Sequence, residues 1–157
     1  MILDNKYQPA FTLIELLVTT SIIMLIAGFG LASWQTFNQQ QTLDAAAQDL
    51  KNNLRLARSW AMVVKKTACA DSKIAAGYEV DFNIANGYRF REKCADGSNG
   101  AWQNFFYPAG VADNYDGSFI FAPLTGATNL SVEEVIICLN LGSRSKTVTI
   151  RKNGEIE

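Results

Sequence analysis

The chain has 157 residues, 48% of them hydrophobic and 18% charged, with a net charge of −1 at neutral pH. This length suits one modest domain with a hydrophobic extension, and the small net charge excludes a strong overall attraction to nucleic acid or anionic lipid. The chain contains no histidine, so the commonest general base and the commonest transition-metal ligand are missing. The composition therefore favours neither an enzyme nor a metal or cofactor site.

The first element in chain order is an apolar run, residues 11–32, whose one charge is Glu15. As a helix it rises about 33 Å, enough to cross the hydrocarbon core of a bilayer. A carboxylate inside such a segment costs about 2.5–3.5 kcal/mol, so it requires a partner. A cut between Ala10 and Phe11 would create an α-amine four residues from Glu15. Because the first turn of its own helix binds the amine poorly, the Glu15 of a neighbouring subunit is the better partner, and the pair would favour side-by-side packing of these helices.

Two plainer interpretations of this run remain. An ordinary secretory signal would be cut after its apolar segment at an Ala-x-Ala-like site, and residues 28–40 offer no convincing one. A simple signal-anchor helix would leave Glu15 unexplained.

The second helical segment continues to residue 66. Residues 33–64 contain neither proline nor glycine, and apolar residues recur there at three- and four-residue spacing. This pattern predicts an amphipathic helix with one apolar stripe. The stripe comprises Leu43, Ala46, Ala47, Leu50, Leu54, Ala57, Ala61 and Val64.

Strands follow the helix. Apolar and polar residues alternate over 78–84 and again over 88–91, and Asn86-Gly87 between them predicts a two-residue hairpin turn. Further strand candidates are residues 102–107, 118–122, 134–139 and 146–151, of which 134–139 is expected to be buried on both faces. The prediction is an α+β fold of six to seven strands, whose sheet is covered by the second half of the helix.

Two short segments invite functional interpretations that we do not favour. The turn at residues 113–117 is rich in Asp and Asn, but its spacing does not match the EF-hand loop, and an Asx turn explains it better. Trp102, Phe105, Phe106 and Tyr107 could form an exposed recognition patch, although core packing is the better explanation.

Three cysteines, Cys69, Cys94 and Cys138, form no C-x-x-C pair, which argues against zinc and thioredoxin-like chemistry. At most one internal bridge is possible. Cys69–Cys94 is the first choice, because Cys94 lies in a polar loop-like stretch and Cys69 follows the long helix, whereas Cys138 is expected to be a buried strand thiol. The alternative is three reduced, buried cysteines.

The segment Ala10-Phe11-Thr12-Leu13-Ile14-Glu15-Leu16 resembles the class III signal of type IV pilins and type II secretion pseudopilins. The resemblance implies that a prepilin peptidase cuts before Phe11 and methylates the new N-terminus, and that Glu15 docks the subunit into a growing filament. The family prefers glycine before the cut, where this chain has Ala10.

The same resemblance implies the pilin fold and four segments. These are a leader (1–10), a transmembrane and assembly helix (11–32), its amphipathic continuation (33–66) and a β-rich domain (67–157). The precursor would span the inner membrane once with its β-rich domain in the periplasm, where disulfides persist, and would then enter a pilus or pseudopilus.

The body of the chain resembles the GspH/FimT group of minor pseudopilins. The matching residues are Asp49-Leu50, Leu54, Ala57-Arg58-Ser59 and Ala61, followed by the tail segments 137–142, 147–150 and 153–154. This resemblance implies a low-copy subunit near a filament tip. Its partners would be other pilin subunits, prepilin peptidase and the inner membrane, with no small-molecule substrate.

One alternative function is DNA binding in natural transformation. Some FimT-like proteins bind DNA through a Gly-Arg-x-Arg pattern near the C-terminus, and this chain has a shifted version of that pattern. Its cations are Arg144, Lys146, Arg151 and Lys152. They could contact a few phosphates, or they could simply keep an edge hairpin soluble. A membrane-tethered enzyme, the third class, lacks any catalytic constellation.

Overall fold

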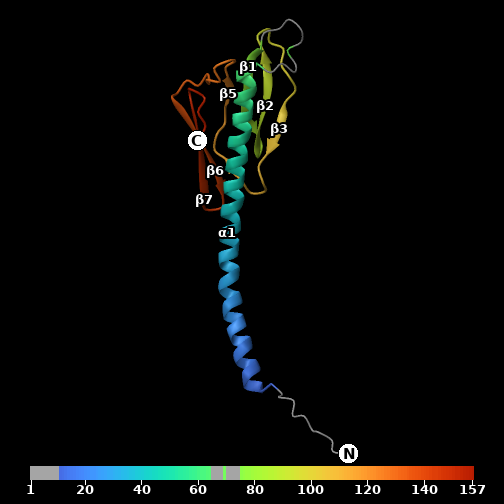
Figure 1. Cartoon of the computed structure of the whole chain (residues 1–157), viewed down its shortest axis with the longest axis vertical. Coiled ribbons are helices and arrows are strands. Elements are labelled where there is room, and N and C mark those ends of the chain that lie inside the picture. The colour runs from blue at the N-terminus through green and yellow to red at the C-terminus, as the bar shows by residue number, and fades with distance from the viewer. Residues whose placement is uncertain (1–10, 65–68, 70–74) are drawn as a thin grey trace, which may run out of the picture. The chain divides into compact units, whose positions relative to one another are not determined.

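The computed structural model describes residues 11–64, 69 and 75–157, with only the backbone for residues 29–33. The chain divides into two compact units, Met1–Asn38 and Gln39–Glu157. The described residues form one helix, α1 (Leu13–Met62), and seven strands: β1 (Ala75–Ile84), β2 (Gly87–Cys94), β3 (Gln103–Phe106), β4 (Ala112–Asp113), β5 (Ser118–Phe121), β6 (Glu134–Leu141) and β7 (Arg144–Arg151) (Figure 1). The predicted α+β architecture, a helix packed on antiparallel sheet, is confirmed.

In the second unit, α1 buries the predicted apolar stripe against the strands from Leu43 to Ala61, whereas the last predicted member, Val64, lies beyond the helix and is half-buried. Leu43, Leu50 and Leu54 have no exposed surface, and each such side chain stabilises the fold by about 1.5–3 kcal/mol. The helix ends at Met62, four residues before the predicted end. Val64 has a φ of 51°, and a β-branched residue in that conformation cannot continue a right-handed helix. Residues 65–68, the end of the predicted continuation and the start of the predicted domain, lie outside the described residues.

The larger sheet has the strand order β3-β2-β1-β5, with every neighbouring pair antiparallel. The inward side chains of β1, including Tyr78 and Val80, are buried. Trp60 on α1 packs its ring 5.6 Å from that of Tyr78 and 5.7 Å from that of Phe90. This aromatic contact joins the helix to the centre of the sheet.

The β1–β2 hairpin turns one residue earlier than predicted. Ala85 and Asn86 form the turn, Asn86 has a φ of 57°, and Gly87 already belongs to β2, opposite Ile84. A Cβ atom on Gly87 would lie 2.2 Å from the Phe105 carbonyl oxygen. Glycine is therefore required here by the close approach of β3 to the backbone, and not by a turn conformation.

The smaller sheet has the order β4-β6-β7, also antiparallel. Ile137 and Leu139 on β6 are buried, but Ile136 is 49% exposed and Cys138 is half-buried. The prediction that residues 134–139 are buried on both faces is therefore wrong, as is the prediction of a buried Cys138 thiol. Only one face of this sheet packs on the core, so its outward side chains meet solvent.

The aromatic segment around β3 is divided between core and surface. Tyr107 is buried, and Phe105 stacks on Tyr88 and Phe90 with ring centroids 5.4 Å and 4.8 Å apart. Phe106 is 70% exposed. Core packing thus holds for Phe105 and Tyr107 but is wrong for Phe106, because the side chains of an edge strand alternate between the two faces.

Trp102 lies half-buried on the outward side of the larger sheet. The Arg89 and Arg91 guanidinium carbons lie 4.3 Å and 4.1 Å from its ring centroid. Each arginine also forms an ion pair across to β1, Arg89 with Asp81 at 2.7 Å and Arg91 with Glu79 at 2.8 Å. Trp102 therefore stacks on two arginines at the surface, and these contacts stabilise the outward face of the sheet. The prediction of core packing is wrong for this residue too.

Among the residues that the structure describes, no helical stretch is long and apolar enough to cross a membrane. The spanning role of residues 11–32 therefore remains a prediction from the sequence.

Candidate functional site

The first turn of α1 starts directly after the predicted cleavage position. Thr12 is the N-cap: its Oγ1 accepts a hydrogen bond from the Glu15 backbone N–H at 3.3 Å, and its carbonyl accepts from Glu15 and Leu16. Thr12 and Glu15 have the Thr-x-x-Glu spacing of a capping box, a cap worth about 1 kcal/mol. The sequence analysis gives Thr12 no role of its own, although the Thr-x-x-Glu spacing can be seen in the sequence.

Glu15 lies in that first turn with an exposed side chain. Its neighbours are apolar and also exposed: Phe11 by 79%, Leu13 by 82% and Ile14 by 71%. Within the described part of the chain, no side chain forms an ion pair with the Glu15 carboxylate. Within residues 11–28, Glu15 thus presents a carboxylate without a counter-charge in a large apolar surface, an arrangement that another chain can complete. Ala10 and the rest of the leader lie outside the described residues.

The hydroxyl groups that follow Glu15 are satisfied by the helix itself. Thr19 donates to the Leu16 carbonyl at 3.0 Å, Thr20 donates to the Leu17 carbonyl at 3.1 Å, and Ser21 donates to the same Leu17 carbonyl at 2.7 Å. Hydroxyls bonded in this way need no water and can enter an apolar environment at low cost. Glu15 is the one charged residue among residues 11–28, and its carboxylate requires a cationic partner in an apolar environment.

A disulfide joins Cys69 to Cys94, with 5.8 Å between their Cα atoms. This is the pairing that the sequence favoured. The two cysteines and Ala75 form a small buried cluster away from the main core. The bridge therefore ties the segment after α1 to the end of β2, while Cys138 is a free thiol.

The four candidate DNA-binding cations do not form one patch. Arg144 and Lys146 lie on the side of β7 that packs towards α1, where Arg144 donates to Gln40 Oε1 at 2.6 Å and Lys146 pairs with Asp44 at 2.8 Å. The Lys146 hydrogen bond holds the pKa of the Asp44 carboxyl below its usual value. These two cations are thus engaged by the helix.

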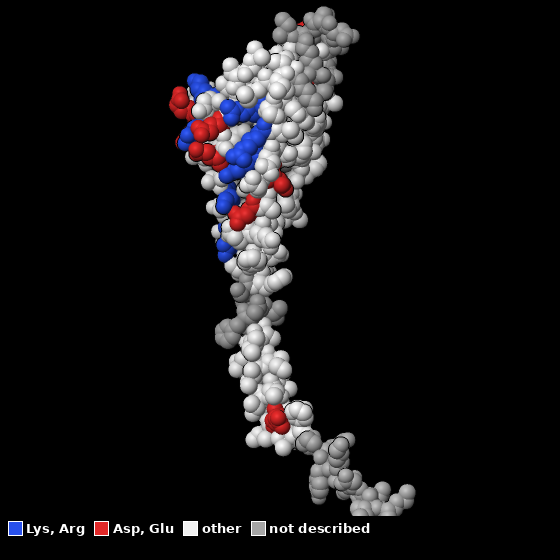
Figure 2. All heavy atoms as spheres, in the orientation of Figure 1, with Lys and Arg blue, Asp and Glu red and all other residues white. Residues whose placement is uncertain are grey.

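Arg151 lies on the opposite side of β7, among three carboxylates. Its nitrogen atoms lie 3.0 Å from Glu155, 3.2 Å from Glu157 and 4.0 Å from Glu134. Lys152 is exposed beside this group. Figure 2 shows acidic and basic atoms side by side on this part of the second unit, a mixture that weakens its attraction for phosphates.

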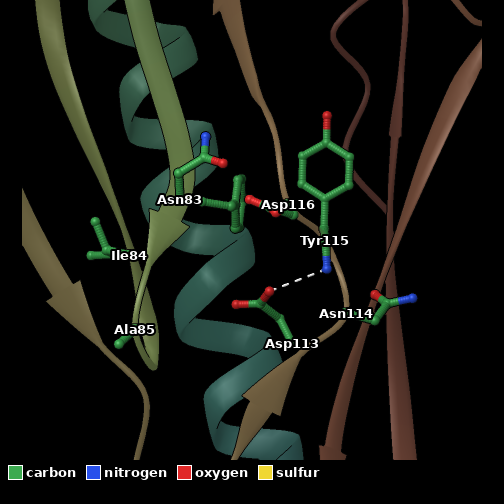
Figure 3. Close-up of a pocket in the computed structure, with 8 residues that line it drawn as sticks. Asn83, Ile84, Ala85, Asp113, Asn114, Tyr115 and Asp116 are labelled. Atoms are coloured by element: carbon green, nitrogen blue, oxygen red, sulfur yellow. Dashed lines mark hydrogen bonds between the residues drawn. The ribbon is translucent and has the colours of Figure 1, made fainter.

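An open pocket of about 440 Å³ lies between the end of β1 and the segment from β4 to β5. It is lined by two carboxylates, Asp113 and Asp116, and by aromatic, amide and small side chains (Figure 3). Asp113 Oδ1 accepts a hydrogen bond from the Tyr115 backbone N–H at 3.2 Å, as expected of an Asx turn. Burial, together with the negative charge of Asp116, raises the pKa of the Asp113 carboxyl. Across the described residues, no group of three or more Cys, Asp or Glu side chains is placed to hold a metal ion.

Comparison with known proteins identifies one family feature. The prokaryotic N-terminal methylation motif matches residues 5–31. No curated protein and no solved structure matches the chain. The motif covers residues 5–10 of the predicted leader, the capped start of α1 and Glu15, so it includes the exposed site described above. The chain therefore carries a type IV prepilin-like N-terminus at residues 5–31, which supports a type IV pilin-like protein.

Proposed function

We propose that the chain is a minor pilin-like subunit of the GspH/FimT type, assembled into a type IV pilus or a type II secretion pseudopilus. In this proposal, prepilin peptidase cuts between Ala10 and Phe11 and methylates the Phe11 amine. The precursor is anchored in the inner membrane, and its sheet domain lies in the periplasm. The periplasm is an oxidising compartment, in which the Cys69–Cys94 disulfide would persist.

The observation that carries the proposal is that the Thr12 cap and the Glu15 carboxylate lie in one helical turn inside the methylation motif, residues 5–31. Both residues lie at the start of α1, where no side chain of the described residues forms an ion pair with Glu15. Removal of the leader would leave Phe11 as a cationic terminus directly before the cap. A carboxylate and an ammonium that meet in an apolar helix bundle attract each other strongly, and the loss of either one leaves a buried charge without a partner. Pairing between subunits therefore selects the register in which the helices pack.

The experiment is a competition between wild-type and Glu15→Ala subunits for entry into filaments, quantified by isotope-coded mass spectrometry. We expect at least about a tenfold loss of incorporation, because the ammonium of a neighbour would be buried alone. Thr12→Ala is the matched control: it weakens the helix start by about 1 kcal/mol and keeps the charge pair. Equal incorporation of Glu15→Ala and wild type contradicts the proposal.

DNA binding in natural transformation receives no support from the positions of its candidate residues. Arg144 and Lys146 contact α1, and Arg151 is surrounded by carboxylates. Retention of duplex DNA by wild type and by an Arg144→Ala/Lys146→Ala variant, compared at two salt concentrations, separates the two functions. A strong, salt-dependent affinity that this variant loses would restore the DNA-binding function.

A further inference from the structure

Five cationic side chains form a column along the edge of α1 that faces β7. Lys51, Arg55 and Arg58 lie at positions i, i+4 and i+7 of the helix, which places them on one face. The same face carries Gln40 and Asp44, which contact Arg144 and Lys146 of β7. From residue 40 to residue 58 the helix rises about 27 Å. We call Lys51, Arg55, Arg58, Arg144 and Lys146 the basic column, and Figure 2 shows Lys and Arg atoms following this line in the second unit.

The positive charge of the basic column is largely uncompensated. Arg55 donates to the Ile156 carbonyl at 3.0 Å, and Arg58 donates to the Asn153 carbonyl at 3.4 Å. These bonds orient the guanidinium groups without neutralising them, because a carbonyl carries no net charge. Among the described residues, Asp44 is the one carboxylate in an ion pair with the column. In the part of the chain that the structure describes, the five cations of the column therefore have one carboxylate in an ion pair with them, on a chain whose net charge is −1.

The surroundings of the basic column favour a folded protein partner over a polyanion. Glu155 and Glu157 belong to the same C-terminal tail whose carbonyls hold Arg55 and Arg58. These carboxylates would repel the dense charge of a nucleic acid backbone. A protein surface can instead place carboxylates opposite the cations and avoid the acidic border, and complementarity of this kind selects partners.

The chain itself carries a surface of the required chemistry. The pocket lined by Asp113 and Asp116 also contains Phe82 and Tyr115, whose ring centroids are 5.3 Å apart. A guanidinium or ammonium group inserted there would meet carboxylates and aromatic rings together, and both attract cations. Figure 3 views the pocket with α1 behind the labelled side chains, whereas in Figure 1 α1 lies in front of the strands. The pocket and the basic column thus open on different faces of the second unit.

We propose that the basic column of one copy docks against the acidic–aromatic pocket of a second copy of this chain. The proposal rests on the filament function proposed above and names the partner surface. Because the two surfaces lie on different faces, the contact is head-to-tail and does not close into a symmetric dimer, which is the geometry that extends a filament. A low-abundance subunit could form short runs of its own kind in this way.

The first test is carbodiimide cross-linking of the full-length chain in detergent micelles, with isotope-labelled and unlabelled copies mixed. We expect peptides that join Lys51 of one copy to Asp113 or Asp116 of another, and we expect them to disappear at high salt. The Lys146–Asp44 pair, 2.8 Å apart within one chain, is the internal positive control. If this intrachain product forms and no mixed-isotope product involves the pocket, the proposal is overturned.

The second test is a charge swap measured by sedimentation of fluorescent full-length chains. Lys51→Glu and Asp116→Lys should each weaken self-association at least about tenfold, because like charges then face each other. A mixture of the two variants should recover association, since the reversed column then meets the reversed pocket. Lys152→Glu and Glu133→Lys, matched charge changes at exposed positions outside both surfaces, should alter association less than about twofold.

Two other outcomes also decide the matter. If the mixture of Lys51→Glu and Asp116→Lys does not recover association, the proposed contact is overturned. It is also overturned if the basic column binds duplex DNA and does not bind a second copy of the chain. Either failure leaves the proposed function intact if the mature chain still begins at Phe11 and Glu15→Ala still blocks incorporation. The two proposals can therefore fail separately.

Discussion

The Cys69–Cys94 disulfide should account for a large part of the stability of the sheet domain. The bridge closes a loop with a sequence separation of 25 residues. In the chain-entropy description, removing the constraint on a loop of this length costs about 3.5 kcal/mol at 25 °C. A domain with a stability of about 5–15 kcal/mol would lose between about a fifth and about 70% of it. We therefore expect Cys69→Ala/Cys94→Ala to be folded but strongly destabilised.

The assay is pulse proteolysis of the full-length chain in detergent across a urea series. The midpoint should fall by about 1–3 M, given the usual dependence of stability on urea for a domain of this size. Cys138→Ala, which removes the half-buried free thiol, is the matched control and should shift the midpoint by less than about 0.5 M. A double variant whose midpoint lies within about 0.3 M of this control would refute the reasoning.

Three further predictions use the same assay. Leu54→Ala should cost about 2–5 kcal/mol because Leu54 is fully buried under the sheet, whereas Leu56→Ala, at a position 39% exposed on the same helix, should cost much less. Trp102→Ala should cost about 1–2 kcal/mol through its two arginine contacts, and a phenylalanine there should restore part of that loss. Burial opposes ionisation of Asp81, but hydrogen bonds from Asn83 and Arg89 outweigh it and lower the pKa of Asp81. Asp81 should therefore stabilise the fold above pH 3.8, its ordinary pKa, and lose that contribution as the pH falls through the lower native pKa, a dependence that Asp81→Asn should flatten.

Local patterns in the sequence predicted the helix and most strands. The recurrence of Leu43, Leu50 and Leu54 identified the buried face of α1, because helix periodicity and burial are coupled directly. The alternation in β1 and β2 predicted the central hairpin of the larger sheet for the same reason. The two-residue strand β4 was missed, since Ala112 and Asp113 carry no alternation and join the sheet only through pairing with β6.

Long-range contacts decided what the sequence could not show. Gly87 has the appearance of a turn glycine, but its role depends on the Phe105 carbonyl of another strand. Arg144 and Lys146 have the spacing of a basic recognition loop, yet their partners Gln40 and Asp44 lie about a hundred residues earlier in the chain. The role of Thr12 is the exception, because the Thr-x-x-Glu spacing was local and readable.

The central claim is that this chain becomes a filament subunit when its leader is removed in front of Phe11. The most direct measurement is the intact mass and terminal sequence of the chain purified from the inner membrane of cells that contain prepilin peptidase. We predict a polypeptide that starts at Phe11 and carries one methyl group on its terminal nitrogen. A mature protein that still starts at Met1 would contradict the account.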